Sequence, residues 1–199
     1  MKKMKNLIPI YSVMVIGIFS RMGCGSDMLT APGAENDDQT VVSKQIGIPT
    51  DQLNIVPLKR EYAEQLRQLT KHGYEEKLVT VNKGGTVGGK HTLKNKVKVP
   101  SNALEEDTWI SVNVECIDDN DDQCGATVEF LPSMQFLLDV TVTLSYDILD
   151  FDGDPATLKV MWYDETTGLW VEVEDPKINK KQKTVSVQVD HFTRYSWSL

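Results

Sequence analysis

One acidic segment has the residue types and spacing of a calcium-binding loop. Asp118, Asn120 and Asp122 alternate along the chain, and Glu129 occupies the twelfth position counted from Asp118. Oxygen ligands at the first, third, fifth and twelfth positions hold calcium in such loops. The glycine required at the sixth position is Gln123, however, and no flanking helices are predicted. We therefore favour a solvated hairpin loop, with a calcium site as the alternative.

A second acidic run, residues 147–154, has a similar alternation. Asp150, Asp152 and Asp154 stand at every second position, but no glutamate follows at the twelfth. The Asp-Gly and Asp-Pro pairs within the run are typical of turns. A solvated turn is the favoured interpretation, and calcium binding is again the alternative.

Residues 84–91, GGTVGGKH, approach the spacing of a phosphate-binding loop. A lysine follows the second pair of glycines, and His91 stands where the metal-binding serine or threonine would be. Such a loop must open a helix whose N-terminus faces the phosphates, whereas residues 92–99 have a strand-like pattern. The glycines are therefore predicted to serve a turn or bulge between strands.

The first residues predict export and a lipid anchor. Three lysines precede an apolar run over residues 7–19, and a small-residue site follows at Gly23-Cys24, as in a secretory signal. The run is shorter than the roughly 20 residues that span a bilayer. Residues 22–26 resemble the end of a bacterial lipobox, although Arg21 replaces the usual aliphatic residue. We predict a signal peptide over 1–23 and lipidation of Cys24, which places the protein in the cell envelope; a plain secretory signal or an uncleaved anchor is the alternative.

The cysteine count agrees with this compartment. Lipidation of Cys24 leaves Cys116 and Cys124, the other two of three cysteines, as a disulfide pair in an oxidising environment.

Charge restricts the partners. The formal net charge is −8, and removing residues 1–23 deletes four basic residues and no acid, which lowers it to −12. Such a chain repels nucleic acids and anionic lipid surfaces, so contact with the membrane is expected only through the anchor. The three histidines, His72, His91 and His191, are too scattered for a zinc site, and no cofactor is predicted.

The remaining chain must supply the elements that position these residues. Residues 24–56 are predicted to be a flexible tether because their first part is small and polar. Residues 57–77 are predicted to be a short helical or linker segment, since Leu58, Tyr62, Leu66 and Leu69 recur at helical spacing. From residue 78 to 199 the apolar period is two, with turn residues between about eight short runs, as at 109–114, 140–146 and 185–189. This pattern predicts an all-β, antiparallel β-sandwich.

The order of these strands resembles the ZU-type domain of zona-occludens proteins, ankyrins and netrin receptors. Residues 84–114 are similar to its opening, and residues 128–146 to its following strand pair. The matching residues are Pro100, Ala103, Leu104, Glu106, Asp107, Thr108, Ile110, Phe130, Pro132, Phe136, Val140 and Thr141. Asp139 replaces a proline usual before the Val-Thr strand. The resemblance covers residues 78–199 and implies a β-sandwich of the kind found in bacterial surface lipoproteins.

The resemblance also gives the end of the chain a chemical interpretation. Some ZU-type domains cut themselves at a His-Phe-Ser motif, and His191-Phe192-Thr193 is similar to it. His191 would be the base and Thr193 the nucleophile that attacks the Phe192 carbonyl. The alternative, which we favour, is a last strand whose aromatic residues close the core.

The function predicted from the sequence is a noncatalytic envelope module that binds a protein partner. No serine-nucleophile elbow, zinc-protease helix or free cysteine is present to support an enzyme. The loops 118–122 and 147–154 and the outward aromatics Trp109, Trp162 and Trp170 are the predicted contacts; a helix over 57–72 covering Trp109 is the alternative for that residue. Self-processing at Phe192-Thr193 and calcium-dependent adhesion are the alternative functions.

Overall fold

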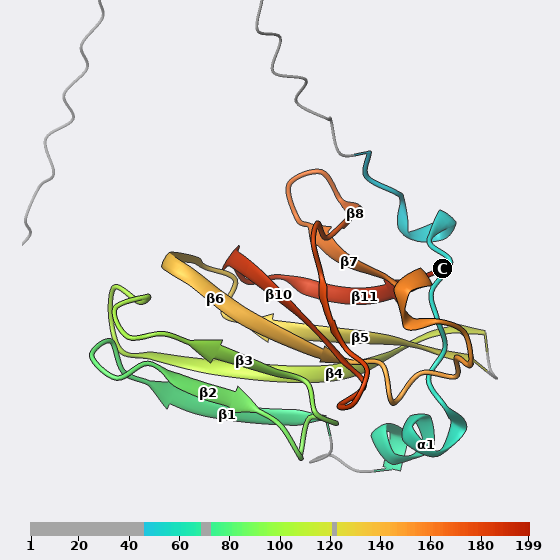
Figure 1. Ribbon diagram of the computed structural model, residues 1–199, viewed down its shortest axis with the longest axis horizontal. Helices are drawn as coiled ribbons and strands as arrows, with labels where there is room; N and C mark the ends of the chain where they lie inside the picture. Colours follow the sequence, from blue (N-terminus) through green and yellow to red (C-terminus); the bar gives the residue numbers. More distant parts are fainter. Residues whose placement is uncertain (1–45, 69–72, 121–122) are drawn as a thin grey trace, which may run out of the picture. The chain divides into compact units, whose positions relative to one another are not determined.

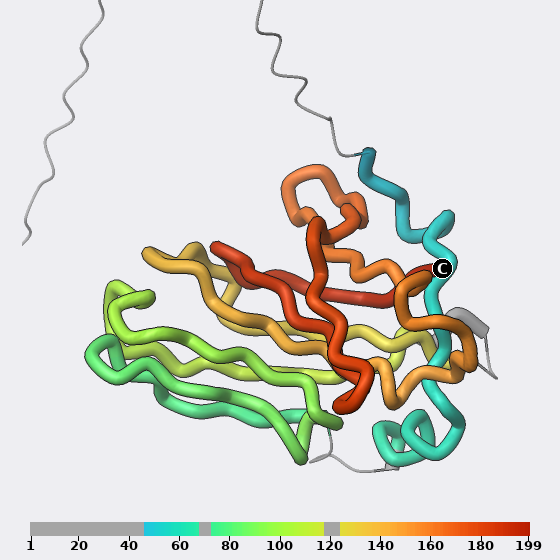
Figure 2. The backbone as a smooth tube through the Cα atoms, in the orientation of Figure 1, coloured from blue at the N-terminus to red at the C-terminus, as the bar shows by residue number. Residues whose placement is uncertain are grey.

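The computed structural model describes residues 46–68, 73–120 and 123–199, whose strands form two antiparallel sheets. Figures 1 and 2 show the sheets as two facing layers. The predicted β-sandwich is therefore confirmed. The predicted signal peptide, Cys24 and the predicted tether up to residue 45 lie outside the described residues. In the described part of the chain, no helix is long and apolar enough to cross a membrane.

Each sheet is built from hairpins, and the chain crosses between the sheets after each hairpin. Sheet 1 has the order β1–β4–β5–β11–β7–β8, with β1 (Tyr74–Val79), β4 (Thr108–Asn120), β5 (Gln123–Leu131), β7 (Lys159–Asp164), β8 (Leu169–Glu172) and β11 (Arg194–Ser198). Sheet 2 has the order β2–β3–β6–β10–β9, with β2 (Gly85–Gly88), β3 (Lys96–Val99), β6 (Gln135–Ser145), β9 (Lys177–Asn179) and β10 (Thr184–His191). One α-helix, α1 (Arg60–Gln68), and the short 3-10 turns η1 (Thr50–Gln52) and η2 (Pro155–Thr157) complete the described elements.

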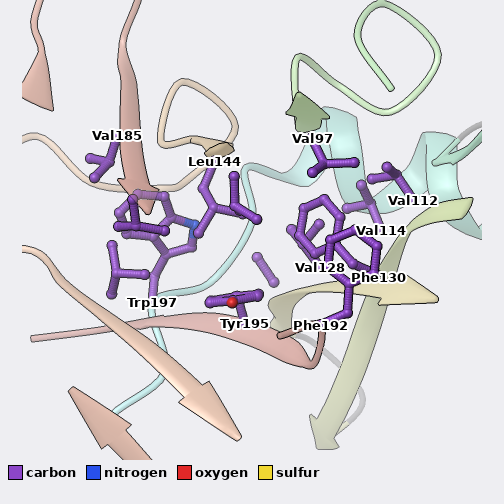
Figure 3. Close-up of a cluster of buried hydrophobic side chains, with 14 of the residues drawn as sticks. Val97, Val112, Val114, Val128, Phe130, Leu144, Val185, Phe192, Tyr195 and Trp197 are labelled. Atoms are coloured by element: carbon purple, nitrogen blue, oxygen red, sulfur yellow. The ribbon is translucent and has the colours of Figure 1, made fainter. Parts of the chain in front are cut away.

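The core lies between the sheets because the two-residue period places one apolar row of each strand inward. In β6, Val140, Val142 and Leu144 are fully buried while the intervening threonines face outward. Figure 3 shows the aromatic centre of the core, where the rings of Phe130 and Phe192 lie 5.6 Å apart. The final strand thus supplies core side chains, as the favoured interpretation predicted.

The longest hairpin, β4–β5, contains the predicted disulfide. Cys116 lies opposite Ala126 and Cys124 opposite Asp118, so the two cysteines are diagonal neighbours on one face of the hairpin. Their Cα atoms are 5.2 Å apart, and the Cys116–Cys124 bond is formed. This confirms the pairing predicted from the cysteine count.

The tether prediction is wrong for residues 46–56. The segment 46–58, which we call the strap, packs on sheet 1. The backbone N–H of Ile48 donates to the Trp170 carbonyl and the Trp170 N–H donates back, so the strap closes the free edge of β8. Leu53 is buried with Met161 and Trp170 on the outward side of β7 and β8. Polar composition favours a tether only where no apolar anchors follow, and Ile48, Leu53 and Val56 are such anchors.

The end of the strap lies within sheet 1. β5 and β11 pair only over Arg194–Ser196, and beyond that the strap fills the space between them. The Val56 N–H donates to the Trp197 carbonyl on one side, and the Leu58 N–H donates to the Cys124 carbonyl on the other. Because these bonds satisfy both neighbours, the strap is a structural part of the sandwich.

The helix predicted within residues 57–77 is present as α1, and β1 begins at Tyr74, four residues before the predicted domain boundary. Tyr62 and Leu66 pack against the core, as their spacing predicted. The predicted stripe residue Leu69 lies outside the described residues, as does His72. The glycines of residues 84–89 serve a turn and β2: Gly84 has φ +64° and a Cβ there would lie 2.3 Å from the Val99 carbonyl oxygen.

Candidate functional site

The outward side of sheet 1 has a covered half and a bare half. The strap covers β7 and β8, and its Ile55 lies against Gly125 of β5, whereas the outward residues further along β1, β4 and β5 include the exposed Leu78, Trp109 and Leu131. We call these outward residues of β1, β4 and β5 the bare face. It contains the largest exposed aromatic side chain of the described chain, Trp109.

Trp109 stands in a small apolar group. It lies directly opposite Leu78 of β1, and Leu131 of β5 lies one step along the sheet, opposite Ser111. The exposed fractions are 60% for Trp109, 41% for Leu78 and 39% for Leu131, while Ile110 between the outward residues is fully buried. We call Leu78, Trp109 and Leu131 the Trp109 patch. Its side chains remain in water although Val79, Ile110 and Phe130 on the other face of the same strands are buried.

Polar and acidic residues border the patch along the same face. Glu76 lies opposite Ser111, and Glu115 lies opposite Thr127 further along β4. Glu129 accepts an ion pair from Arg194 at 3.0 Å, where the bare half meets the covered half. The bare face therefore has an apolar end, followed by acidic residues and by the exposed Tyr74 opposite Asn113.

The structure corrects two of the three predicted outward tryptophans. Trp170 is 1% exposed, because the strap covers it and the Thr50 hydroxyl accepts a hydrogen bond from its indole N–H at 3.1 Å. Trp162 is half-buried, with its ring 5.0 Å from that of His191. Trp109 is outward as predicted, and the alternative in which a helix covers it is wrong.

The first candidate calcium loop is only partly described. The side chains of Asp118 and Asn120, and Asp122 as a whole, lie outside the described residues. Glu129 is described, and it is bonded to Arg194 in the middle of the sheet. It stands five residues along β5 from Cys124, or about 17 Å at the usual rise per residue, which is too far for a ligand of the hairpin tip.

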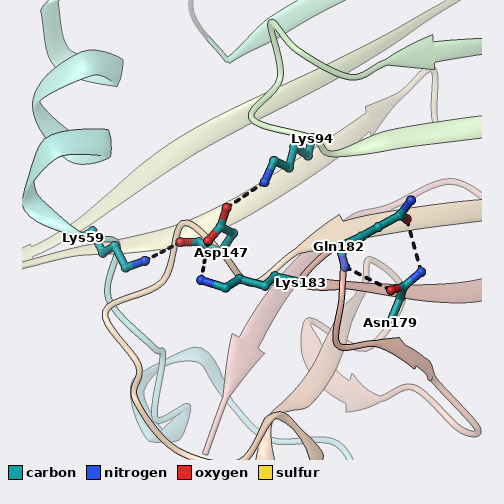
Figure 4. A network of polar contacts seen from close by, with 6 residues as sticks. All are labelled: Lys59, Lys94, Asp147, Asn179, Gln182 and Lys183. Atoms are coloured by element: carbon teal, nitrogen blue, oxygen red, sulfur yellow. Dashed lines mark hydrogen bonds and ion pairs between the residues drawn. The ribbon is translucent and has the colours of Figure 1, made fainter.

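The second acidic run is held by lysines. Asp147 accepts ion pairs from Lys94 at 2.7 Å and from Lys183 at 3.0 Å, while Lys59 donates to its backbone carbonyl (Figure 4). The hydrogen bonds from Lys94 and Lys183 lower the pKa of Asp147 from 3.8 to about 2. Asp154 accepts a bond from Lys180 and from the Ala156 N–H. Among the described residues, no group of three or more histidines, cysteines or acids is arranged to hold a metal ion.

The His191-Phe192-Thr193 segment lies at the crossing from β10 to β11. His191 Nδ1 is 2.7 Å from Asp190 Oδ1, and this hydrogen bond lowers the pKa of Asp190. The Thr193 hydroxyl donates to the Tyr163 carbonyl, and Phe192 is buried in the core. Each of the two polar side chains thus has its own partner, and no hydrogen bond joins them in the described structure.

A lysine-rich surface was missed by sequence reasoning. Residues 80–104 contain five lysines and no acidic residue, and residues 176–189 contain four lysines and no acidic residue. The first lysine segment contains β2 and β3, and the second contains β9 and most of β10; in sheet 2 the two segments lie on either side of β6. A count of net charge in sequence windows would have found both segments, whereas the strongly negative total hides them.

Comparison with known proteins does not assign the chain to a family. No family model matches the chain. A search of curated proteins likewise found no significant match.

Proposed function

We propose that the protein is a noncatalytic module of the cell envelope, lipidated at Cys24, whose ZU-like sandwich binds a protein partner through the bare face. The leader sequence and the order of strand motifs support the location and the domain type. The acidic loop at 118–122 and the second acidic run then contribute to binding through charge.

The Trp109 patch is the single observation that carries the binding surface. Aromatic side chains that stay exposed on an otherwise polar sheet face are enriched where proteins contact one another. The patch lies on regular strands, whose backbone is fixed by pairing in β1, β4 and β5. A partner therefore meets a preorganised surface and little ordering entropy is lost on binding.

The acidic surroundings define the chemistry of that partner. Glu76 and, further along β4, Glu115 lie to one side of the apolar end of the face, and the whole chain carries a net charge of −8. A partner segment in which apolar side chains are followed by lysine or arginine matches this distribution. A second copy of the chain would bring like charges together and is disfavoured.

Synthetic peptides test this proposal. A short alternating valine/threonine peptide flanked by lysines should bind the folded protein, and the same peptide flanked by glutamates should bind at least about tenfold more weakly. Trp109→Ala should abolish the binding, whereas Leu137→Ala should not, although Leu137 is 59% exposed on sheet 2. Equal binding of both peptides, or equal loss of binding in both variants, would contradict the bare face as the binding site. If the protein self-associates in analytical sedimentation, the partner is a second copy of the chain and the proposed basic partner is wrong.

Intact mass tests the location and the absence of self-processing. Protein extracted from its host should have the mass of lipidated residues 24–199 and should gain two hydrogens on reduction of Cys116–Cys124. An unlipidated mass would remove the anchor from the proposal. A species ending at Phe192 would replace the noncatalytic module by a self-processing domain.

A further inference from the structure

The outward side of sheet 2 contains a groove of about 630 Å³ that is independent of the Trp109 patch. Lys90, Lys94, Lys96 and Lys181 line it, and the hydroxyl-bearing side chains of Thr143 and Thr184 come from adjacent strands of the sheet. Its volume is within the range of about 300–1,000 Å³ that is usual for small-ligand sites. The composition is unusual for this chain, because lysines dominate a groove in an acidic protein.

Buried polar contacts fix the turn that carries Lys90 and Lys94. The buried side chain of Asn95 donates to the Thr92 carbonyl at 2.9 Å and accepts from the Ser145 N–H of β6 at 2.8 Å. Leu93 and Lys94 have positive φ angles of 54° and 71°, a conformation that the surrounding contacts must hold in place. One side of the groove is therefore preformed.

The turn between β9 and β10 is fixed in a similar way. The Gln182 N–H donates to the Asn179 side-chain oxygen at 3.0 Å, and the two side-chain amides bond to each other (Figure 4). Asp147 then joins the two turns, because Lys94 of the first and Lys183 of the second both bind its carboxylate. The lysine segments, which are about 80 residues apart in the sequence, are thus brought to one groove.

The positive charge of the groove is not neutralised by the protein. Four lysines line it against a single carboxylate, that of Asp147. Within the described residues, Lys90, Lys96 and Lys181 form no ion pair, and of the lining lysines only Lys94 binds the Asp147 carboxylate. Mutual repulsion of these ammonium groups is unfavourable, and a bound anion would relieve it.

We propose that this groove binds an anionic saccharide, a short chain of sugars that bears carboxylate, sulfate or phosphate groups. Lysine is a point charge on a flexible stem, which suits several spaced anionic groups better than one bidentate partner. Thr143, whose hydroxyl bonds to that of Ser186, and Thr184 form the polar floor of the groove, and Tyr62 adds an aromatic ring to the lining. A nucleic acid fits less well, because a longer phosphate chain would leave the groove and meet the acidic remainder of the surface.

Titration of the purified protein with defined oligosaccharides tests the groove. The probes are a sulfated, a carboxylated and a phosphorylated oligosaccharide, each beside its neutral counterpart, and a single-stranded oligonucleotide of similar charge. At least one anionic saccharide should bind, more weakly as salt rises, and no neutral one should. The oligosaccharide that binds most tightly shows whether the natural ligand carries sulfate, carboxylate or phosphate groups. No binding of any anionic saccharide at low salt, equal binding of a neutral one, or tighter binding of the oligonucleotide would overturn the proposal.

Matched variants separate the groove from general charge. Lys96→Glu with Lys181→Glu should weaken saccharide binding by at least about tenfold, as expected for two charge reversals within several ångströms of an anion. Lys77→Glu with Lys83→Glu makes the same change in net charge outside the groove and should change the affinity by less than about twofold. Equal weakening by both pairs would overturn the assignment to the groove.

A variant of the other proposed site keeps the two proposals apart. Trp109→Ala should leave saccharide binding unchanged, so failure of the protein-binding proposal and failure of this one are distinguishable. A loss of saccharide binding in folded Trp109→Ala protein would overturn the assignment to the groove.

Discussion

The two halves of the outward side of sheet 1 differ in the presence of the strap, and that difference changes the role of their tryptophans. Trp170 on β8 is covered by residues 46–58 and belongs to a buried cluster. Trp109 on β4 lies on the same side of the same sheet and remains 60% exposed. Burial on a sheet face is therefore set by the segment that covers it as well as by the strand pattern.

The strands themselves show which half is to be covered. In β7, Val160 and Met161 are consecutive and both buried, so this strand is apolar on both sides. In β4, the apolar residues Ile110 and Val112 alternate with Trp109, Ser111 and Asn113 on the outward face, where Trp109 is exposed and the small, polar Ser111 is buried. A continuous apolar run is typical of a strand that is buried on both faces.

Truncation of the covered tryptophan should have the largest effect on stability. Trp170→Ala should lower the free energy of unfolding by about 3–5 kcal/mol, because it leaves a large cavity beneath the strap and removes the hydrogen bond to Thr50. Urea denaturation measures this change. A loss below about 1 kcal/mol would mean that the strap does not cover this half in solution.

The next largest effect should come from the strap. Leu53→Ala removes most of a side chain that is 8% exposed, and should cost about 2 kcal/mol while making the strap more susceptible to proteolysis. Leu138→Ala, at a residue that is 50% exposed, is the control and should cost less than about 0.5 kcal/mol. Similar costs for both variants would remove the distinction between the strap and an ordinary surface segment.

A change of pH separates the apolar contacts of the strap from the ion pairs of Asp147 with Lys94 and Lys183. The folded-state pKa of Asp147, about 2, is below its ordinary value of 3.8, so its ion pairs stabilise the protein above about pH 4 and are lost as the pH falls through about 2. Asp147→Asn should cost about 1–2 kcal/mol at pH 7, after allowance for solvent screening. The difference from the original protein should shrink between pH 4 and pH 2 in urea denaturation curves. A constant difference over that range would show that the carboxylate charge is not the cause.

The smallest effect on stability should come from the bare half. Trp109→Ala removes a side chain with few covering atoms and should change the free energy of unfolding by less than about 0.5 kcal/mol. Urea denaturation of Trp109→Ala and Trp170→Ala compares the same substitution on the bare half and on the covered half. A loss comparable to that of Trp170→Ala would mean that a segment covers the bare face in solution.

Alternation was sufficient to predict the sandwich and the outward position of Trp109. It did not distinguish Trp170, because its burial depends on residues more than 100 positions earlier in the chain, and short windows contain no such information. The cysteine count predicted the disulfide because only one pairing remained. The groove was missed because the two lysine segments meet only in the folded sheet, where β3 and β10 lie on either side of β6. The apolar period of a strand predicts which side chains face inward, but it does not show which strands lie next to it.

The position of residues 54–58 between β5 and β11 also sets an order of events during synthesis. Their hydrogen-bond partners, Cys124 on one side and Trp197 on the other, are made long after the strap itself. A chain that emerges from its N-terminus must therefore keep residues 54–58 undocked until β11 has appeared, and Leu53 in water until Met161 and Trp170 have been made. A factor that shields apolar segments of newly made chains has its longest opportunity to act on this protein at the strap.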